Sequence, residues 1–402
     1  MYNNNKLISF FIFIMLVNFN VANASTIEDL QLVQILKDDV NGVDGLGNPR
    51  SVKVLSDNSK VFVSSGDDNA LAIFNLDKNF NLTFSQVFKN ASADINGLEG
   101  ASGVSYFDRG NQVVVTGFYD GALSQFSQSH SGYRFSQSIS DGLGYDRVFD
   151  SALPVREFDS LGLLGAWDIV KTNNEKQLFV ASYMSNAISI LDIMPDKKVT
   201  FNRIIKGARP LERDLGKPIT VALSPLNDEL YVLGFDGHQL TVFDRNDKGD
   251  LLVKQVLKNA VAAVEQFINP QKIVVSPNGK FLYVACAGSN AIVVFQKEMT
   301  GYYRFLQAIN NSDIGGSGLE GANSLAISSD GSKIYAAGEL GVGLYLFSAA
   351  VDGRLSYKNK LLSVHDNELN KISSLTLTND NKHLLVATGK NNSLFVFKIK
   401  PI

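Results

Sequence analysis

Short apolar runs recur along the chain at almost constant intervals. Seven apolar anchor residues are separated by 52, 65, 52, 52, 52 and 50 residues: Val52, Val104, Ile169, Val221, Ile273, Leu325 and Leu375. A second apolar run begins nine residues after each anchor, at Val61, Val113, Leu178, Leu230, Leu282, Ile334 and Leu384. Turn-forming residues such as Pro277-Asn278-Gly279 lie between the two runs. Each pair of runs therefore predicts a tight β-hairpin, whose strands we name A and B.

Two more strands follow in most units. An alternating run such as Ala291–Phe295 predicts a third strand, C, in all seven units, and a fourth strand, D, such as Tyr303–Ile309, follows in six. The seventh unit lacks strand D, but residues 30–37 match it and precede the first strand A. We therefore expect an all-β, seven-bladed β-propeller of four-stranded antiparallel blades, whose last blade is closed by the N-terminal strand. Two stacked β-sandwiches would leave the missing strand unexplained.

Residues 1–24 have the pattern of a signal peptide. Lys6 precedes a run of about eleven apolar residues, and Ala22-Asn23-Ala24 fits a small-x-small cleavage site. The apolar run is shorter than the about 20 residues that a membrane-spanning helix needs. We expect cleavage before Ser25, with residues 25–402 as a propeller domain that is exported to the periplasm, the medium or the cell surface and has no stable membrane span. A retained N-terminal anchor is the alternative.

Charge and composition narrow the range of partners. The net charge of −3 becomes −4 when Lys6 is removed, since 36 basic residues then face 40 acidic ones. This balance argues against nucleic acid as a partner. Cys286 is the only cysteine, which excludes an intrachain disulfide, and its apolar neighbours predict a buried side chain without chemistry. We find no nucleophile elbow, zinc-binding motif or phosphate loop, and we expect no cofactor.

The variable loops of the predicted propeller share one face, because the D to A and B to C connections of a four-stranded meander emerge together. Residues 141–160 form an insertion between blades 2 and 3, where the connection is about 13 residues longer than the others. It mixes aromatic and charged residues, which suits a recognition lid, although a loop that packs on itself is equally compatible with the pattern. We expect ligand contacts from this face, at Tyr145, Arg147, Phe149, Arg156, Phe158, Trp167, Tyr119, Tyr183 and His238.

Charged residues also recur in the D to A loops. The acidic ones could line a cation site, but they also fit repeated turn chemistry, and we expect no metal: Asp39, Asp44, Asp94, Glu99, Asp313 and Glu320. The basic ones could bind a small anion or form surface salt bridges: Lys206, Arg209, Arg213 and Lys217.

One repeat unit, Asn269–Phe295, resembles the blade repeat of the lactonase-family β-propellers, and Ser324–Tyr335 is similar. That family includes bacterial 6-phosphogluconolactonases and carboxymuconate cyclases, and related YVTN-type repeats occur in exported proteins. The resemblance implies an Arg-His pair at the start of strand A and a channel mouth where a histidine, a glutamate and arginines meet. Here Arg50 matches the arginine, and Ser51 stands where the histidine would be. The catalytic candidates are then Arg50, Glu99 and Glu320.

Two functions follow from these observations. The leading hypothesis is a non-catalytic binding or scaffold protein that recognises a partner protein or a small ligand on its D to A and B to C loop face. The alternative is a lactonase-type hydrolase of a sugar lactone or a related cyclic ester. Convergent charged groups in a closed pocket at the channel mouth would favour the hydrolase, and a flat aromatic face would favour the binding protein.

Overall fold

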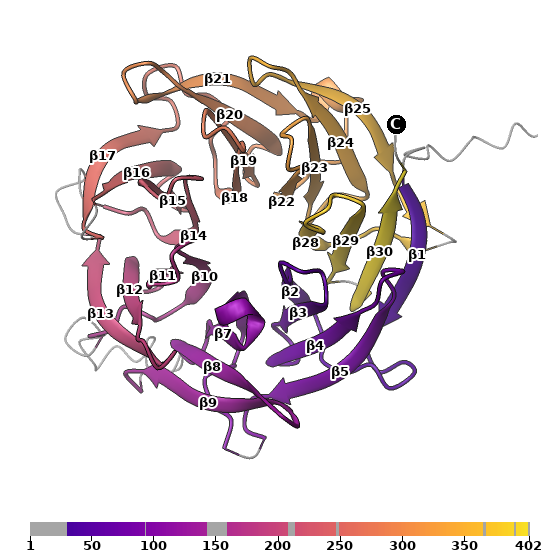
Figure 1. Ribbon diagram of the computed structural model, residues 1–402. Coiled ribbons are helices and arrows are strands. Elements are labelled where there is room, and N and C mark those ends of the chain that lie inside the picture. The colour runs from indigo at the N-terminus through magenta and orange to yellow at the C-terminus, as the bar shows by residue number, and fades with distance from the viewer. Residues whose placement is uncertain are drawn as a thin grey trace, which may run out of the picture.

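The computed structural model describes residues 30–92, 94–142, 159–207, 214–246, 249–364, 367–389 and 391–400. This part of the chain forms seven four-stranded sheets arranged in a ring (Figure 1). The predicted seven-bladed β-propeller is therefore confirmed. The predicted signal peptide lies outside the described residues.

Every blade repeats the same meander from the channel outward. The inner A strands are β2 (Pro49–Val54), β6 (Ala101–Phe107), β10 (Ala166–Lys171), β14 (Pro218–Leu223), β18 (Pro270–Val275), β22 (Ala322–Ile327) and β28 (Ile372–Leu377). The B strands are β3 (Lys60–Ser65), β7 (Gln112–Gly117), β11 (Gln177–Ser182), β15 (Glu229–Gly234), β19 (Phe281–Cys286), β23 (Lys333–Gly338) and β29 (His383–Thr388).

The two outer positions of each blade complete the sheets. The C strands are β4 (Ala70–Leu76), β8 (Ala122–Ser129), β12 (Ala187–Ile193), β16 (Gln239–Arg245), β20 (Ala291–Lys297), β24 (Leu344–Ala349) and β30 (Ser393–Ile399). The D strands are β5 (Leu82–Lys89), β9 (Gly132–Ser140), β13 (Val199–Lys206), β17 (Leu251–Lys258), β21 (Tyr303–Asn310), β25 (Leu355–Leu361) and β1 (Leu30–Lys37). The loops contain the 3₁₀ helices η1 (Asp108–Gly110) and η2 (Asn311–Ile314) and a small hairpin of β26 (Ser363–Val364) and β27 (Asn367–Glu368).

The N-terminal strand closes the ring. β1 pairs antiparallel with β30, from Leu30 opposite Ile399 to Lys37 opposite Ser393, and the last sheet has the order β1-β30-β29-β28 (Figure 1). The predicted closure is confirmed. Because the first strand completes the last blade, the C strand of that blade is not left as an open edge.

The core lies between the blades. Seven clusters of buried apolar side chains occur among the described residues, and each joins two neighbouring sheets. Their members come mostly from the B and C strands, whose side chains are covered on both faces; Cys286 is one of them, as expected. Burial raises the pKa of its thiol well above the usual value, so the cysteine is an apolar filler.

Glutamine side chains join the outer strands of successive blades. At the seam between blades 4 and 5, Gln255 Nε2 donates to the carbonyl of Tyr303 at 2.8 Å, and the Tyr303 N–H donates to Gln255 Oε1 at 2.7 Å. The same two-bond latch joins three other seams: Gln34 with Leu82, Gln86 with Tyr133, and Gln307 with Leu355. Each latch satisfies both backbone groups at the start of the next D strand.

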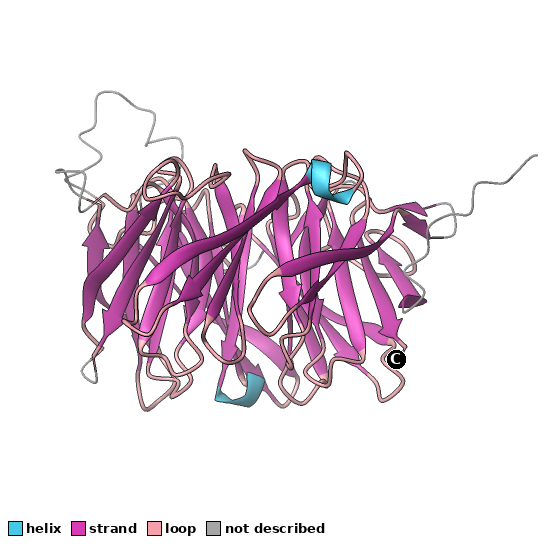
Figure 2. Ribbon diagram, turned by 90° about the horizontal axis from the view of Figure 1, so that it is seen from above, coloured by secondary structure: helices cyan, strands magenta, loops and turns pink. Residues whose placement is uncertain are grey.

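Loops of the D to A and B to C type lie on the same face, as predicted. Gly47 N–H donates to Asp68 Oδ2 at 2.7 Å, and Leu164 N–H donates to Ser185 Oγ at 2.9 Å. These bonds link a D to A loop with the B to C loop of the blade that it enters. Figure 2 views the disc from its side, with loops along both faces. We call the face with these two loop types the loop face. None of the described helices is long and apolar enough to cross a membrane.

Candidate functional site

The inner strands surround a central channel of about 710 Å³. At the start of these strands the pairing with strand B shifts register by one residue, as between Pro49 and Ser51 in β2. Such a β-bulge leaves one residue unpaired and re-aims its side chain. In six blades the unpaired residues are Arg50, Trp167, Ile219, Gln271, Asn323 and Ser373, and all of these except Ile219 line the channel. We call the five channel-lining members the mouth ring.

Two predicted site residues meet in the mouth ring. The guanidinium carbon of Arg50 lies 5.3 Å from the centroid of the Trp167 ring, a cation–π arrangement. Phe118 also packs against the indole, with the two rings perpendicular and their centroids 5.2 Å apart. Glu339, from the B to C loop of blade 6, lines the same channel and was not among the predicted residues.

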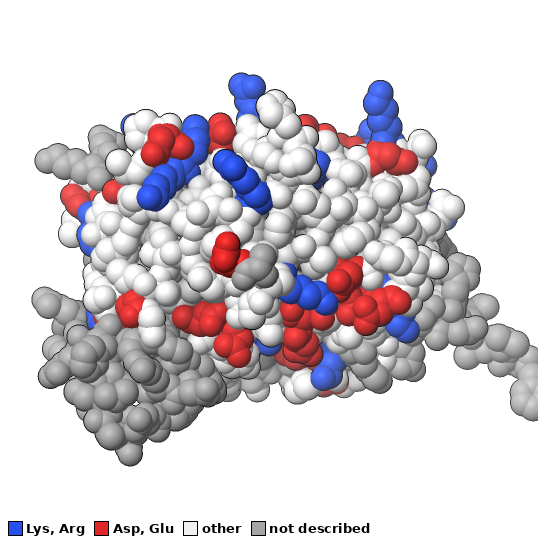
Figure 3. All heavy atoms as spheres, turned by 90° about the horizontal axis from the view of Figure 1, so that it is seen from below, with Lys and Arg blue, Asp and Glu red and all other residues white. Residues whose placement is uncertain are grey.

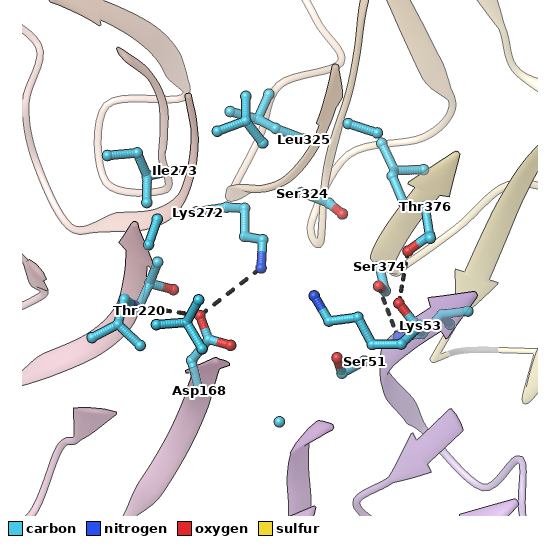
Figure 4. A pocket seen from close by; sticks show the side chains of 18 of the residues that line it. Ser51, Lys53, Asp168, Thr220, Lys272, Ile273, Ser324, Leu325, Ser374 and Thr376 are labelled. Atoms are coloured by element: carbon cyan, nitrogen blue, oxygen red, sulfur yellow. Dashed lines mark hydrogen bonds and ion pairs between the residues drawn. The ribbon is translucent and has the colours of Figure 1, made fainter. Parts of the chain in front are cut away.

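The next residue of every inner strand forms a second ring, one step deeper. We call it the inner ring; it consists of Ser51, Gly103, Asp168, Thr220, Lys272, Ser324 and Ser374, and all seven line the channel. Only Asp168 and Lys272 are charged. The ammonium of Lys272 lies 4.0 Å from Asp168 Oδ2, and the two come from blades 5 and 3 (Figure 4). The N–H groups of Ile169 and Val221 donate to the two oxygens of Asp168, at 2.9 and 3.4 Å.

A second lysine reaches the channel deeper still. Lys53 follows Ser51 by two residues along β2, and Figure 4 shows its ammonium and that of Lys272 directed toward the same open space. Burial is the main cause that lowers the pKa of Lys53; the charge of Lys272 adds to it, and Asp168 opposes it. No carboxylate among the described residues forms an ion pair with Lys53.

The two glutamates predicted as catalytic candidates lie outside the channel lining. Glu320 folds back on its own loop, where its carboxylate accepts hydrogen bonds from the Gly318 N–H at 2.7 Å and from Asn311 Nδ2 at 3.0 Å. Glu99 is exposed, and its N–H donates to Asp120 Oδ2 at 2.8 Å. Of the three candidates, the structure therefore brings only Arg50 to the channel.

His238 holds two loops together. Its Nδ1 accepts a hydrogen bond from the Asn269 N–H at 3.1 Å, across 31 residues. In four other blades an asparagine at the same turn accepts the equivalent bond: Asn69, Asn186, Asn290 and Asn392. All five residues have φ between 48° and 53°, a left-handed conformation that asparagine tolerates better than most residues. His238 thus replaces an asparagine in a repeated loop clasp.

The remaining predicted ligand contacts are placed as follows. Tyr119 packs on the loop face beside Phe118, with their ring centroids 5.1 Å apart. Tyr183 donates to Asp236 Oδ2 at 2.9 Å, and the Lys217 ammonium lies 5.6 Å from the centre of its ring. Neither tyrosine lines the channel. Tyr145, Arg147, Phe149, Arg156 and Phe158 lie outside the described residues, as do Arg209 and Arg213.

Acidic side chains gather along one edge of the side drawn in Figure 3. Among the described residues, the carboxylate groups of Asp38, Asp39 and Asp44 lie within 4.8 Å of one another, and Asp38 was not among the predicted residues. Burial raises the pKa of Asp38, and the charges of its acidic neighbours raise it further. A hydrogen bond from the Leu46 N–H acts in the opposite direction and lowers the pKa. Lys89 forms a 2.6 Å ion pair with Asp44. Asp38 Oδ1 also accepts a hydrogen bond from the Leu46 N–H at 2.8 Å. These acids therefore stabilise the turns of this loop.

Comparisons with known proteins agree with the propeller fold. The family model described as lactonase, 7-bladed beta-propeller, matches residues 167–366. A search of curated proteins finds no match.

Solved structures show the same fold at low sequence identity. A putative 6-phosphogluconolactonase from Bacteroides uniformis is 16% identical with a TM-score of 0.61, over 82% of this chain and 87% of that chain. The periplasmic gluconolactonase of Pseudomonas aeruginosa is 15% identical with a TM-score of 0.62, over 81% and 86%. The resemblance that the repeats predict is thus confirmed: the chain is a seven-bladed β-propeller, and residues 167–366 match the lactonase family model.

Proposed function

We propose that this protein is a lactonase-type hydrolase that takes a sugar lactone or a related cyclic ester into the central channel. The observation that carries the proposal is the convergence of Arg50, Asp168 and Lys272 in one channel of about 710 Å³. A convergent charged pocket of this kind was the feature expected of the hydrolase rather than of a flat binding face. The family match and the lactonase-like neighbours support the same choice.

Asp168 is the proposed general base. The ion pair with Lys272 and the two backbone N–H donors hold its carboxylate in place, and 14% of its side chain is exposed, so it can reach a water molecule in the channel. The water oxygen attacks the lactone carbonyl carbon while its proton passes to Asp168. The ring C–O bond then breaks, and the leaving oxygen takes that proton, which gives a hydroxy acid.

Arg50 is the proposed electrostatic partner. It lies in the mouth ring, one level above Asp168, and its stacking on Trp167 fixes the plane of the guanidinium. A fixed cation directed at the carbonyl oxygen stabilises the negative charge that develops there. The three inner-ring serines, Ser51, Ser324 and Ser374, give the channel hydroxyl groups that suit a sugar-like ligand.

A lactone panel tests the proposal. Purified protein should open at least one sugar lactone, and Asp168→Asn should lower kcat about 10²- to 10⁴-fold, the usual contribution of a general base. Asp196→Asn is the matched control, because Asp196 lies in an exposed turn of the same blade. Absence of turnover above background on every lactone would reject the hydrolase and return the protein to the class of ligand-binding propellers, with which the serine at position 51 agrees.

We also propose that the protein acts outside the cytoplasm. The N-terminal pattern of Lys6, an apolar run and Ala22-Asn23-Ala24 supports export, and one of the similar structures is a periplasmic protein. Cell fractionation combined with N-terminal sequencing tests this. Mature protein that starts at Ser25 in the periplasm or medium is expected, and an intact N-terminus on protein in the cytoplasm would contradict it.

A further inference from the structure

Lys53 carries a charge that the proposed hydrolysis does not use. It is the only charged residue at its level of the inner strands, where the other blades have Ser105, Val170, Ala222, Val274, Ala326 and Thr376. Its side chain is half-buried in the channel wall, and among the described residues no carboxylate neutralises it. A cation that is held away from water without a partner is unfavourable, so such a group is suited to binding an anion.

A second cation faces the same space. The ammonium groups of Lys53 and Lys272 point toward each other across the channel, and they come from blades 1 and 5 (Figure 4). Asp168, at 4.0 Å from Lys272, offsets one of the two positive charges. The three groups together carry a net charge of +1.

That charge selects the ligand. A monoanion neutralises the group, whereas a dianion such as a phosphate monoester would leave a net negative charge beside Asp168 in a confined channel. A carboxylate has two oxygens and can accept a charge-assisted hydrogen bond from each ammonium. The hydroxyl groups of Ser51, Ser324 and Ser374 surround the same space and suit a ligand that carries hydroxyl groups of its own (Figure 4).

We propose that Lys53 and Lys272 form a binding site in the channel for the carboxylate of a small hydroxy acid. The site lies deeper than the mouth ring, because Lys53 follows Arg50 by three residues along β2. It does not depend on hydrolysis. A hydrolase would retain its product there, and a non-catalytic propeller would use the site to recognise its ligand.

The test compares two ligands that differ at one terminal carbon. L-threonate is a four-carbon hydroxycarboxylate, and threitol has the same chain with an alcohol in place of the carboxylate. Isothermal calorimetry on the mature protein should detect threonate binding and no threitol binding. Threonate affinity should fall at least tenfold in Lys53→Met and in Lys272→Met, since a charge-assisted hydrogen bond is lost. Lys280→Met is the control, because Lys280 is an exposed residue of the same blade as Lys272.

Other outcomes separate this site from the proposed catalysis. Asp168→Asn should lower kcat about 10²- to 10⁴-fold. It should also tighten threonate binding several-fold, since it removes the nearby negative charge. Lys53→Arg should retain binding, which shows that charge rather than fold is responsible for the loss in Lys53→Met. Unchanged affinity in both lysine-to-methionine variants, equal binding of threitol, or tighter binding of inorganic phosphate than of threonate would each overturn the carboxylate site. Loss of lactone turnover alone would not.

Discussion

The outer belt of the propeller and its inner ring follow opposite rules. At the outer belt, a glutamine latch joins four seams with the same pair of hydrogen bonds. At the inner ring, equivalent positions carry serine, glycine, aspartate, threonine and lysine. Positions that repeat are occupied by groups that join neighbouring blades, and positions that differ are free of that requirement. The break in the repeat at Asp168 and Lys272 is therefore where we place the proposed function.

The largest effect on stability is expected away from the channel, at Glu229. The side chain of Glu229 is only 2% exposed. Its carboxylate accepts hydrogen bonds from the ammonium group of Lys254 at 2.7 Å and from that of Lys297 at 2.8 Å. Glu229→Ala leaves the partly buried Lys297 without its carboxylate partner and leaves Lys254 with Asp244 alone, and should lower the free energy of unfolding by about 3–5 kcal/mol in urea titrations. The exposed pair of Glu298 and Arg304 is the control, and Glu298→Ala should cost less than about 1 kcal/mol. Equal losses would mean that burial of the pair is unimportant.

The glutamine latch is expected to have the next largest effect. Gln255→Ala removes the partners of the Tyr303 N–H and carbonyl groups and should cost about 1–3 kcal/mol in the same titration. Ser51→Ala in the inner ring, where the side chain is only partly buried, should change stability by less than about 0.5 kcal/mol. If the inner-ring variant were as destabilising as the belt variant, the contrast between the two regions would fail.

Acid should weaken the seam at Glu229. Burial alone would raise the pKa of this glutamate, but hydrogen bonds from Lys254, Lys297 and Tyr231 outweigh burial and lower it below its usual value of 4.5. A carboxylate whose pKa is lower in the folded state stabilises the fold above its unfolded pKa and loses that contribution as pH falls through the folded value. Urea midpoints measured from pH 6 to pH 3 should therefore fall less steeply in Glu229→Gln than in the wild-type protein. Parallel curves would assign the acid sensitivity to other groups.

The smallest effect on stability is expected at Lys53. Unlike the substitutions above, its replacement should not destabilise the fold. Lys53→Met removes a partly buried cation without an ion-pair partner, so the urea midpoint should stay the same or rise slightly. A clear fall in the midpoint would show that Lys53 contributes to the fold, which would weaken its assignment to a ligand.

The seven-bladed ring could be predicted from the sequence. The charged residues of the channel could be predicted only in part. The anchor spacing and the misplaced D strand determine seven blades and their closure, because both depend on apolar periodicity. Asp168 and Lys272 lie one residue before their anchors, and an alignment of the seven repeats would have revealed them as the only charged members of that column. Glu320 and His238 were placed on the correct face, but loop hydrogen bonds direct them to Gly318 and Asn269. The bonds of Glu320 leave no periodic trace in the sequence, whereas the clasp at His238 recurs as an asparagine in four other blades, which the same alignment would have revealed.

The most direct measurement compares lactone turnover and urea unfolding in two variants, Asp168→Asn and Gln255→Ala. We predict that Asp168→Asn loses about 10²-fold or more in kcat with a nearly unchanged urea midpoint. We predict that Gln255→Ala has a lower midpoint and, below its unfolding transition, wild-type kcat. Turnover that survives in Asp168→Asn, or that falls equally in both variants, would contradict the assignment of function to the inner ring.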